Sequence, residues 1–106
     1  MVVNALEEKK AENILLLDIK DISTFTDYFV IASGTSDRML ESLSKATEEA
    51  LKKSHAVKVR AEGYARDGWI LIDAGDVVIH LFSPDQRDYY RLEELWSQGK
   101  ILLRLQ

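Results

Sequence analysis

The hydrophobic pattern is clearest over residues 69–82, where two apolar segments flank the polar stretch 73–76. Both segments are rich in β-branched and aromatic residues, and the stretch between them contains a glycine suited to positive φ. The pattern predicts a β-hairpin with Ala74 and Gly75 as its two-residue loop. The predicted cross-strand pairs are Asp73 with Asp76, Ile72 with Val77, Leu71 with Val78, Ile70 with Ile79, and Trp69 with His80.

The two faces of this hairpin differ, because successive side chains of a strand point to opposite sides. One face is aliphatic and belongs in a core; it comprises Ile70, Ile72, Val77, Ile79 and Leu81. The other face mixes an indole, two aliphatic side chains, two carboxylates and an imidazole; it comprises Trp69, Leu71, Asp73, Asp76, Val78 and His80. Two interpretations of this mixed face stay open. Either a helix covers its apolar residues, or the face is an exposed apolar patch with an acidic edge that marks a protein partner.

Elsewhere the pattern predicts helices over residues 2–12, 36–54 and 83–97. Strands are predicted over residues 14–19, 28–33 and 57–60, the last of them an exposed edge strand. Residues 62–68 are predicted to form a loop, and the apolar tail 100–106 either adds a strand or extends freely. The order of elements predicts one α+β domain over residues 1–106, with a single mixed sheet of about five strands and helices packed on it.

Charge and composition narrow the class of partner. The chain has 106 residues, a formal net charge of −4 and no cysteine. An acidic chain is not expected to grip a phosphate backbone directly, and it suits a basic protein partner. Disulfides and thiolate metal sites are excluded, and no apolar run approaches the length of a membrane span. We therefore expect a cytoplasmic protein that does not contact membranes.

Two groups of residues could carry chemistry. Gly34, Thr35 and Ser36 precede a predicted helix and could hold a phosphate, but the stretch lacks a P-loop or dinucleotide signature, which favours a turn and a helix cap. Asp73, Asp76 and His80 could in principle bind a metal. In the predicted register His80 lies about 13 Å from Asp76, too far for one shared ion. The sequence therefore predicts neither an enzyme, nor a cofactor, nor a metal site.

Four stretches together resemble the Iojap family, the ribosomal silencing factors, across about residues 5–97. They are Leu16-Leu17-Asp18-Ile19, residues 27–38 (DYFVIASGTSDR), residues 69–82 (WILIDAGDVVIHLF) and residues 87–96 (RDYYRLEELW). The combination, in this order and spacing, is highly specific. The resemblance implies a truncated nucleotidyltransferase fold, a mixed sheet with helices on both sides.

The resemblance also implies a function and a partner. Members of the family bind the large ribosomal subunit through its protein number fourteen, block joining with the small subunit, and lower translation when nutrients are short. In that role the mixed hairpin face would be the partner surface, with Trp69 and Leu71 at its apolar centre and Asp73 and Asp76 at its acidic rim. Trp is a residue type enriched at interface hot spots.

Two alternatives of other classes remain. One is a nucleotidyltransferase-related enzyme that uses the helix start at residues 34–36. That chemistry needs two carboxylates at alternating strand positions to hold magnesium, whereas here Asp73 is followed by the turn and Asp76 lies across it. Binding of nucleotide and magnesium distinguishes this alternative from silencing. The other alternative is a ribosome-assembly protein that acts as a homodimer.

Overall fold

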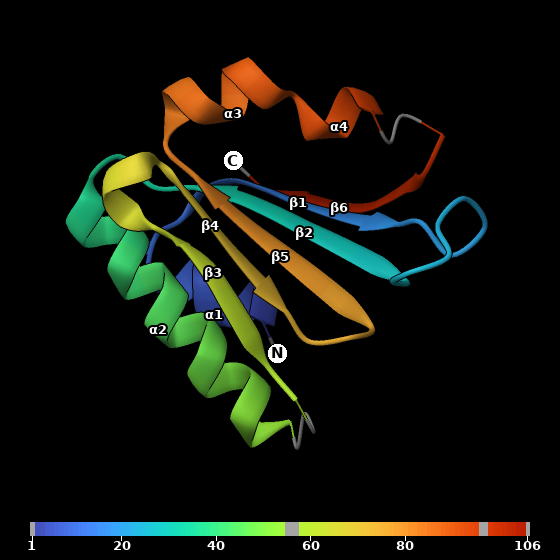
Figure 1. Ribbon diagram of the computed structural model, residues 1–106, viewed down its shortest axis with the longest axis horizontal. Coiled ribbons are helices and arrows are strands. Elements are labelled where there is room, and N and C mark those ends of the chain that lie inside the picture. The colour runs from blue at the N-terminus through green and yellow to red at the C-terminus, as the bar shows by residue number, and fades with distance from the viewer. Residues whose placement is uncertain (1, 55–57, 96–97, 106) are drawn as a thin grey trace.

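The computed structural model describes residues 2–54, 58–95 and 98–105 (Figure 1). The helices are α1 (Val2–Glu8), α2 (Asp37–Lys53), α3 (Pro84–Tyr90) and α4 (Leu92–Leu95), and a 3-10 helix spans Ala65–Asp67. The strands are β1 (Glu12–Asp18), β2 (Tyr28–Ser33), β3 (Arg60–Tyr64), β4 (Trp69–Asp73), β5 (Val77–Phe82) and β6 (Lys100–Leu105). They form one six-stranded sheet in the order β3-β4-β5-β2-β1-β6. Only the central β2–β5 pair is parallel, so the predicted α+β class with a mixed sheet is confirmed.

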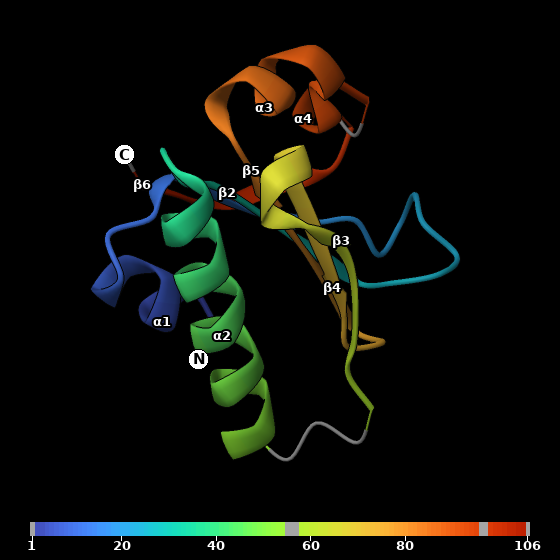
Figure 2. The same cartoon turned by 60° about the vertical axis from the view of Figure 1, so that its left-hand side comes forward.

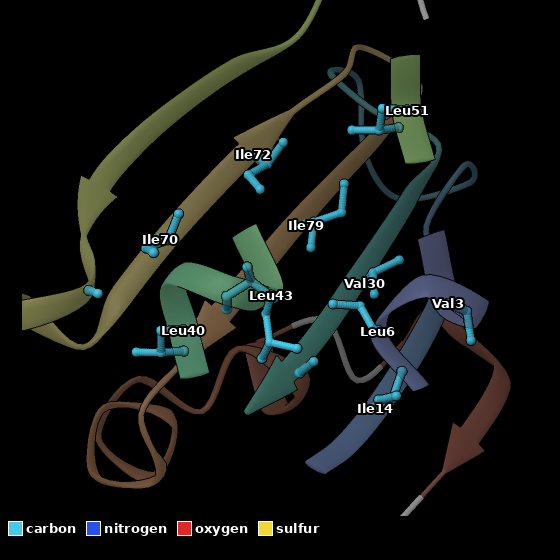
Figure 3. Close-up of a cluster of buried hydrophobic side chains, with 13 residues drawn as sticks. Val3, Leu6, Ile14, Val30, Leu40, Leu43, Leu51, Ile70, Ile72 and Ile79 are labelled. Atoms are coloured by element: carbon cyan, nitrogen blue, oxygen red, sulfur yellow. The ribbon is translucent and has the colours of Figure 1, made fainter. Parts of the chain in front are cut away.

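Helices cover both faces of the sheet. Figure 2 shows α1 and α2 on one side, and α3 and α4 on the other. Strand β1 is buried on both faces as predicted, because Ile14 packs into the cluster under α1 and α2 whereas Leu15 and Leu17 pack into the cluster on the α3 side. The larger cluster, drawn in Figure 3, includes Leu6, Val30, Leu40, Leu43, Ile70, Ile72, Ile79 and Leu81. The aliphatic hairpin face therefore lies in the core, as the alternation predicts.

The predicted hairpin forms, but its register differs by two residues from the prediction. Trp69 lies opposite Phe82, whereas the prediction placed it opposite His80. Ala74 N donates a hydrogen bond of 2.9 Å to the carbonyl of Val77, so the two-residue loop consists of Gly75 and Asp76. The predicted loop of Ala74 and Gly75 is therefore wrong. Gly75 has a φ of 87°, the conformation that the turn requires and that glycine adopts without strain. Because the shift is even, the strand residues stay on their predicted faces.

Helices α2 and α3 both begin with a side-chain cap. The Ser36 hydroxyl accepts a hydrogen bond from Met39 N at 3.0 Å at the start of α2, and the Ser83 hydroxyl accepts one from Gln86 N at 3.3 Å at the start of α3. The last helix is shorter than predicted, because Arg91 adopts a φ of 47° and separates α3 from α4. The end of that prediction, residues 96 and 97, lies outside the described residues.

The edges of the sheet were predicted less well. Strand β3 begins at Arg60 and continues through residues predicted to be a loop, whereas the predicted strand 57–60 begins at a residue outside the described ones. The tail adds a strand, β6, which pairs with β1 and raises the count from about five strands to six. The first helix ends at Glu8, four residues earlier than predicted.

Candidate functional site

The mixed hairpin face lies on the α3 side of the sheet and is only partly covered. Trp69, Leu71 and Asp73 project from β4 and keep part of their surface exposed. Val78 and His80 project from β5 and are buried, each 5% exposed. Asp76 lies in the turn rather than on a strand and is exposed. The structure thus brings the predicted residues together, but only four of the six reach the surface.

Helix α3 covers one edge of the Trp69 indole. The ring centroids of Trp69 and Tyr90 are 4.5 Å apart, and Phe82 supports the indole from β5 at 5.0 Å. Leu92 packs against the same cluster. The predicted cover by the last helix is therefore confirmed in part, since the helix covers one side of the face and leaves the rest open. The interpretation of the open part as a partner surface stays a prediction. Trp96, which belongs to the last predicted helix, lies outside the described residues.

His80 supports Trp69 from below. The Trp69 Nε1–H group donates a hydrogen bond to His80 Nδ1 at 3.2 Å, which fixes the orientation of the indole. Burial lowers the pKa of His80 to about 4, so the imidazole is neutral near pH 7 and Nδ1 can accept this bond. His80 Nε2 is buried without a hydrogen-bond partner among the described residues. His80 is therefore placed as a support for Trp69 rather than as a surface residue.

Aromatic rings form a row across this face that sequence analysis missed. Phe25, in the loop after β1, lies 6.0 Å from Phe29, and Phe29 meets His80 edge-on at 4.8 Å. The row continues through Trp69 to Tyr90. Phe25 is 59% exposed at one end. The only signal in the sequence was the presence of aromatic residues in segments that the sheet brings together, and the strand order is needed to see it.

The two aspartates of the hairpin have different roles. Asp73 Oδ1 accepts a hydrogen bond from Gly75 N at 2.9 Å, so this carboxylate stabilises the turn. The carboxylate of Asp76 is exposed. Residues 2–54, 58–95 and 98–105 contain no group of three or more His, Asp or Glu side chains that could hold a metal ion.

The helix start at residues 34–36 is occupied by contacts within the chain. Gly34 N donates to the carbonyl of Phe82 at 2.9 Å, and the Ser36 hydroxyl caps α2. A Cβ atom at Gly34 would lie 3.1 Å from Leu40 and 3.2 Å from Leu43, so the turn packs closely on the helix that follows. The geometry favours the turn and cap over a phosphate cradle, since the Gly34 amide and the Ser36 hydroxyl already have partners within the chain.

Comparison with known proteins identifies the family. The family model described as "Ribosomal silencing factor during starvation" matches residues 1–104. The chain belongs to this family. The resemblance carried by the four sequence stretches is thereby confirmed, and membership associates this silencing-factor chain with the ribosome and with translation regulation. The family is not a known family of enzymes.

Relatives and solved structures agree with this assignment. Ribosomal silencing factor RsfS of Halalkalibacterium halodurans is 40% identical over 99 residues, covering 93% of this chain and 85% of that protein. "Mitochondrial assembly of ribosomal large subunit protein 1" of Mus musculus is 37% identical over 100 residues, covering 92% of this chain and 44% of that protein. The crystal structure of a Chromobacterium violaceum protein is similar with a TM-score of 0.86 at 31% identity, covering 97% of this chain and 88% of that one. None of the helices in the described part of this silencing-factor chain has the length and apolar character needed to span a bilayer.

Proposed function

We propose that the protein binds the large ribosomal subunit through its protein number fourteen, blocks joining with the small subunit, and so represses translation when nutrients are short. Family membership supports this proposal, and the name of the mouse relative mentions the ribosomal large subunit. The net charge of −4 suits docking on a basic ribosomal protein.

The observation that carries the proposal is the partly exposed Trp69 on the hairpin face whose other end carries the acidic turn. An indole held by His80 and Tyr90 loses little conformational freedom on binding, and such a rigid aromatic group is a typical interface anchor. We assign the partner contact to Trp69, Leu71, Asp73 and Asp76. Val78 and His80 belong to the same face, and we propose that they act from beneath it as support.

Sedimentation with purified subunits tests the proposal. The protein is expected to co-sediment with free large subunits and not with small ones. Trp69→Ala should weaken large-subunit binding by at least about 2 kcal/mol, or roughly 30-fold, because it removes the apolar anchor. Asp76→Lys should mainly slow association and reduce its salt dependence, since Asp76 lies in the exposed turn.

Melting temperatures of the same variants separate binding from folding. A folded Trp69→Ala protein with unchanged affinity would remove Trp69 from the interface. Equal binding of the wild-type protein to both subunits, or to neither, would contradict the proposal as a whole.

We also propose that the chain has no nucleotidyltransferase activity. The amide of Gly34 and the hydroxyl of Ser36 are already bonded within the chain, and Asp73 and Asp76 lie on either side of Gly75 in a turn. No incorporation of labelled nucleotide is expected in the presence of magnesium. Incorporation that disappears in Asp73→Asn or Asp76→Asn would establish the enzymatic alternative.

A further inference from the structure

We propose that the loop between β1 and β2, residues 19–27, is a second part of the surface that binds the ribosomal partner, with Phe25 as its apolar anchor. The inference rests on the proposed function, because it assigns to the same basic protein partner a contact outside the hairpin. Neither the hairpin pattern nor the four family stretches include Phe25.

The position of Phe25 on the molecule is the first argument. Its ring centroid lies 6.0 Å from that of Phe29, Phe29 contacts His80, and Trp69 donates a hydrogen bond to His80. Phe25 therefore belongs to the aromatic row on the face that carries the indole. At 59% exposure, most of the Phe25 ring faces outward. Aromatic residues are enriched in protein interfaces relative to the rest of the surface.

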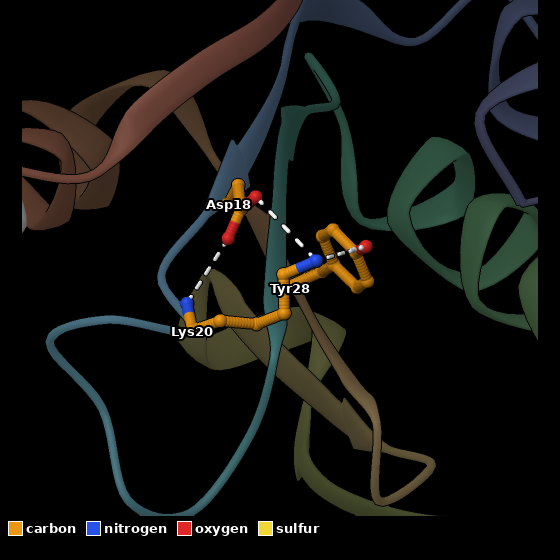
Figure 4. Close-up of polar contacts among 3 residues, drawn as sticks. All are labelled: Asp18, Lys20 and Tyr28. Carbon is orange, nitrogen blue, oxygen red and sulfur yellow. Dashed lines mark hydrogen bonds and ion pairs between the residues drawn. The ribbon is translucent and has the colours of Figure 1, made fainter.

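Hydrogen bonds at its base hold the loop in one conformation. Ile19 N donates to the carbonyl of Asp27 at 2.9 Å, and the Ser23 hydroxyl accepts from Phe25 N at 3.2 Å. Figure 4 shows further contacts at the base of the loop. The Lys20 ammonium donates to the Tyr28 hydroxyl at 3.1 Å and lies 3.7 Å from the Asp18 carboxylate. A loop that is already ordered presents its side chain at a low entropic cost of binding.

The same loop is joined to the hairpin turn. Asp27 N and Tyr28 N both donate to the carbonyl of Asp76, each at 3.0 Å. The backbone that presents Phe25 and the backbone that presents the hairpin carboxylates are therefore fastened together, so a single partner surface can meet both. This continuity favours one occupant over two independent partners.

Charge at this junction matches a basic partner. Asp21, Asp27 and Asp76 are all exposed there, whereas Lys20 is engaged by Asp18 and Tyr28. The expected complement is a protein surface with an apolar depression for the ring and lysine or arginine side chains around it.

Phe25→Ala and Leu102→Ala form a matched pair of test variants. Leu102 is 51% exposed and lines an apolar groove with Val2 and Leu16 on the α1 side of the sheet. With purified large subunits, Phe25→Ala is expected to lose about tenfold or more in affinity, as truncation of an interface anchor does. Leu102→Ala is expected to stay within about twofold of wild type, since it leaves that surface unchanged.

The affinities of the wild-type protein and of the two variants can each overturn the inference. A folded Phe25→Ala protein with affinity within about twofold of wild type would do so, and if Trp69→Ala still weakens binding, the proposed function stands. An equal loss in Leu102→Ala would also overturn it. A wild-type protein that does not bind large subunits would overturn both proposals.

If Phe25→Ala fails to fold, amide hydrogen exchange of the wild-type complex decides. Protection of residues 19–27 in that complex supports the inference, and unchanged exchange overturns it.

Discussion

Ile79→Ala is expected to lower the free energy of unfolding by about 2–5 kcal/mol, the largest change that we predict for a single substitution. Ile79 is fully buried and lies opposite Ile72 on the hairpin face that packs under α2. Truncation removes apolar burial and leaves a cavity that the surrounding aliphatic side chains fill only in part. Urea denaturation monitored by circular dichroism measures the difference.

Leu102→Ala serves as the control for this experiment, because an exposed apolar side chain contributes little to stability. Ile72→Ala should lower the free energy of unfolding by about as much as Ile79→Ala. The effect of the double variant should differ from the sum of the two single effects, since residues in contact are coupled. Stability of Ile79→Ala within error of wild type would mean that the assignment of inner and outer faces is inverted.

Acidification from pH 6.5 to pH 4 is expected to remove about 3 kcal/mol of stability through His80 alone. The ordinary pKa of 6.5 applies to the unfolded chain, whereas burial lowers the pKa to about 4 in the folded protein. Between these values the unfolded chain binds a proton that the folded protein does not, so unfolding becomes easier as the pH falls. The cost is absent above pH 6.5 and complete below about pH 4.

His80→Phe isolates this contribution from that of the carboxylates, which also titrate at low pH. The variant keeps an aromatic ring between Phe29 and Trp69 but has no proton to take up. Its stability should fall less steeply than that of wild type between pH 6.5 and pH 4.5 in a series of denaturation experiments. Parallel slopes for the two proteins would show that the pKa of His80 is not lowered in the folded protein.

The sequence was most informative where burial repeats with a fixed period. The two faces of the hairpin were predicted correctly although the register was wrong, because a shift of two residues preserves the alternation. The register depends on the turn, and the stretch 73–76 accommodates Gly75 as either the first or the second loop residue. The strand register and the closing hydrogen bond from Ala74 distinguish the two arrangements.

Features that depend on tertiary contacts were missed. Strand β3 contains Gly63 and is exposed along its whole length, so neither composition nor burial marks it as a strand. The break at Arg91 requires a left-handed conformation that is uncommon for arginine, and nothing in the local pattern signals it. At the site, the mixed composition of the face was visible, but the burial of His80 and the contact from Phe25 follow from strand order. The alternation of residue types along one strand does not show which residues of other segments pack beside it.

We expect the parallel pairing of β2 with β5 to limit how quickly the chain folds. Each of these strands also has an antiparallel partner nearby in sequence, β1 for β2 and β4 for β5. The two antiparallel pairs need only short loops. Joining them requires the ends of the segment 34–76 to come together, and this loss of chain entropy precedes the contacts that offset it. The two hairpins are then early structures and their association is the slow step. Substitutions at the β2–β5 seam would change the rate of folding, and those at the outer strands β3 and β6 would change the rate of unfolding.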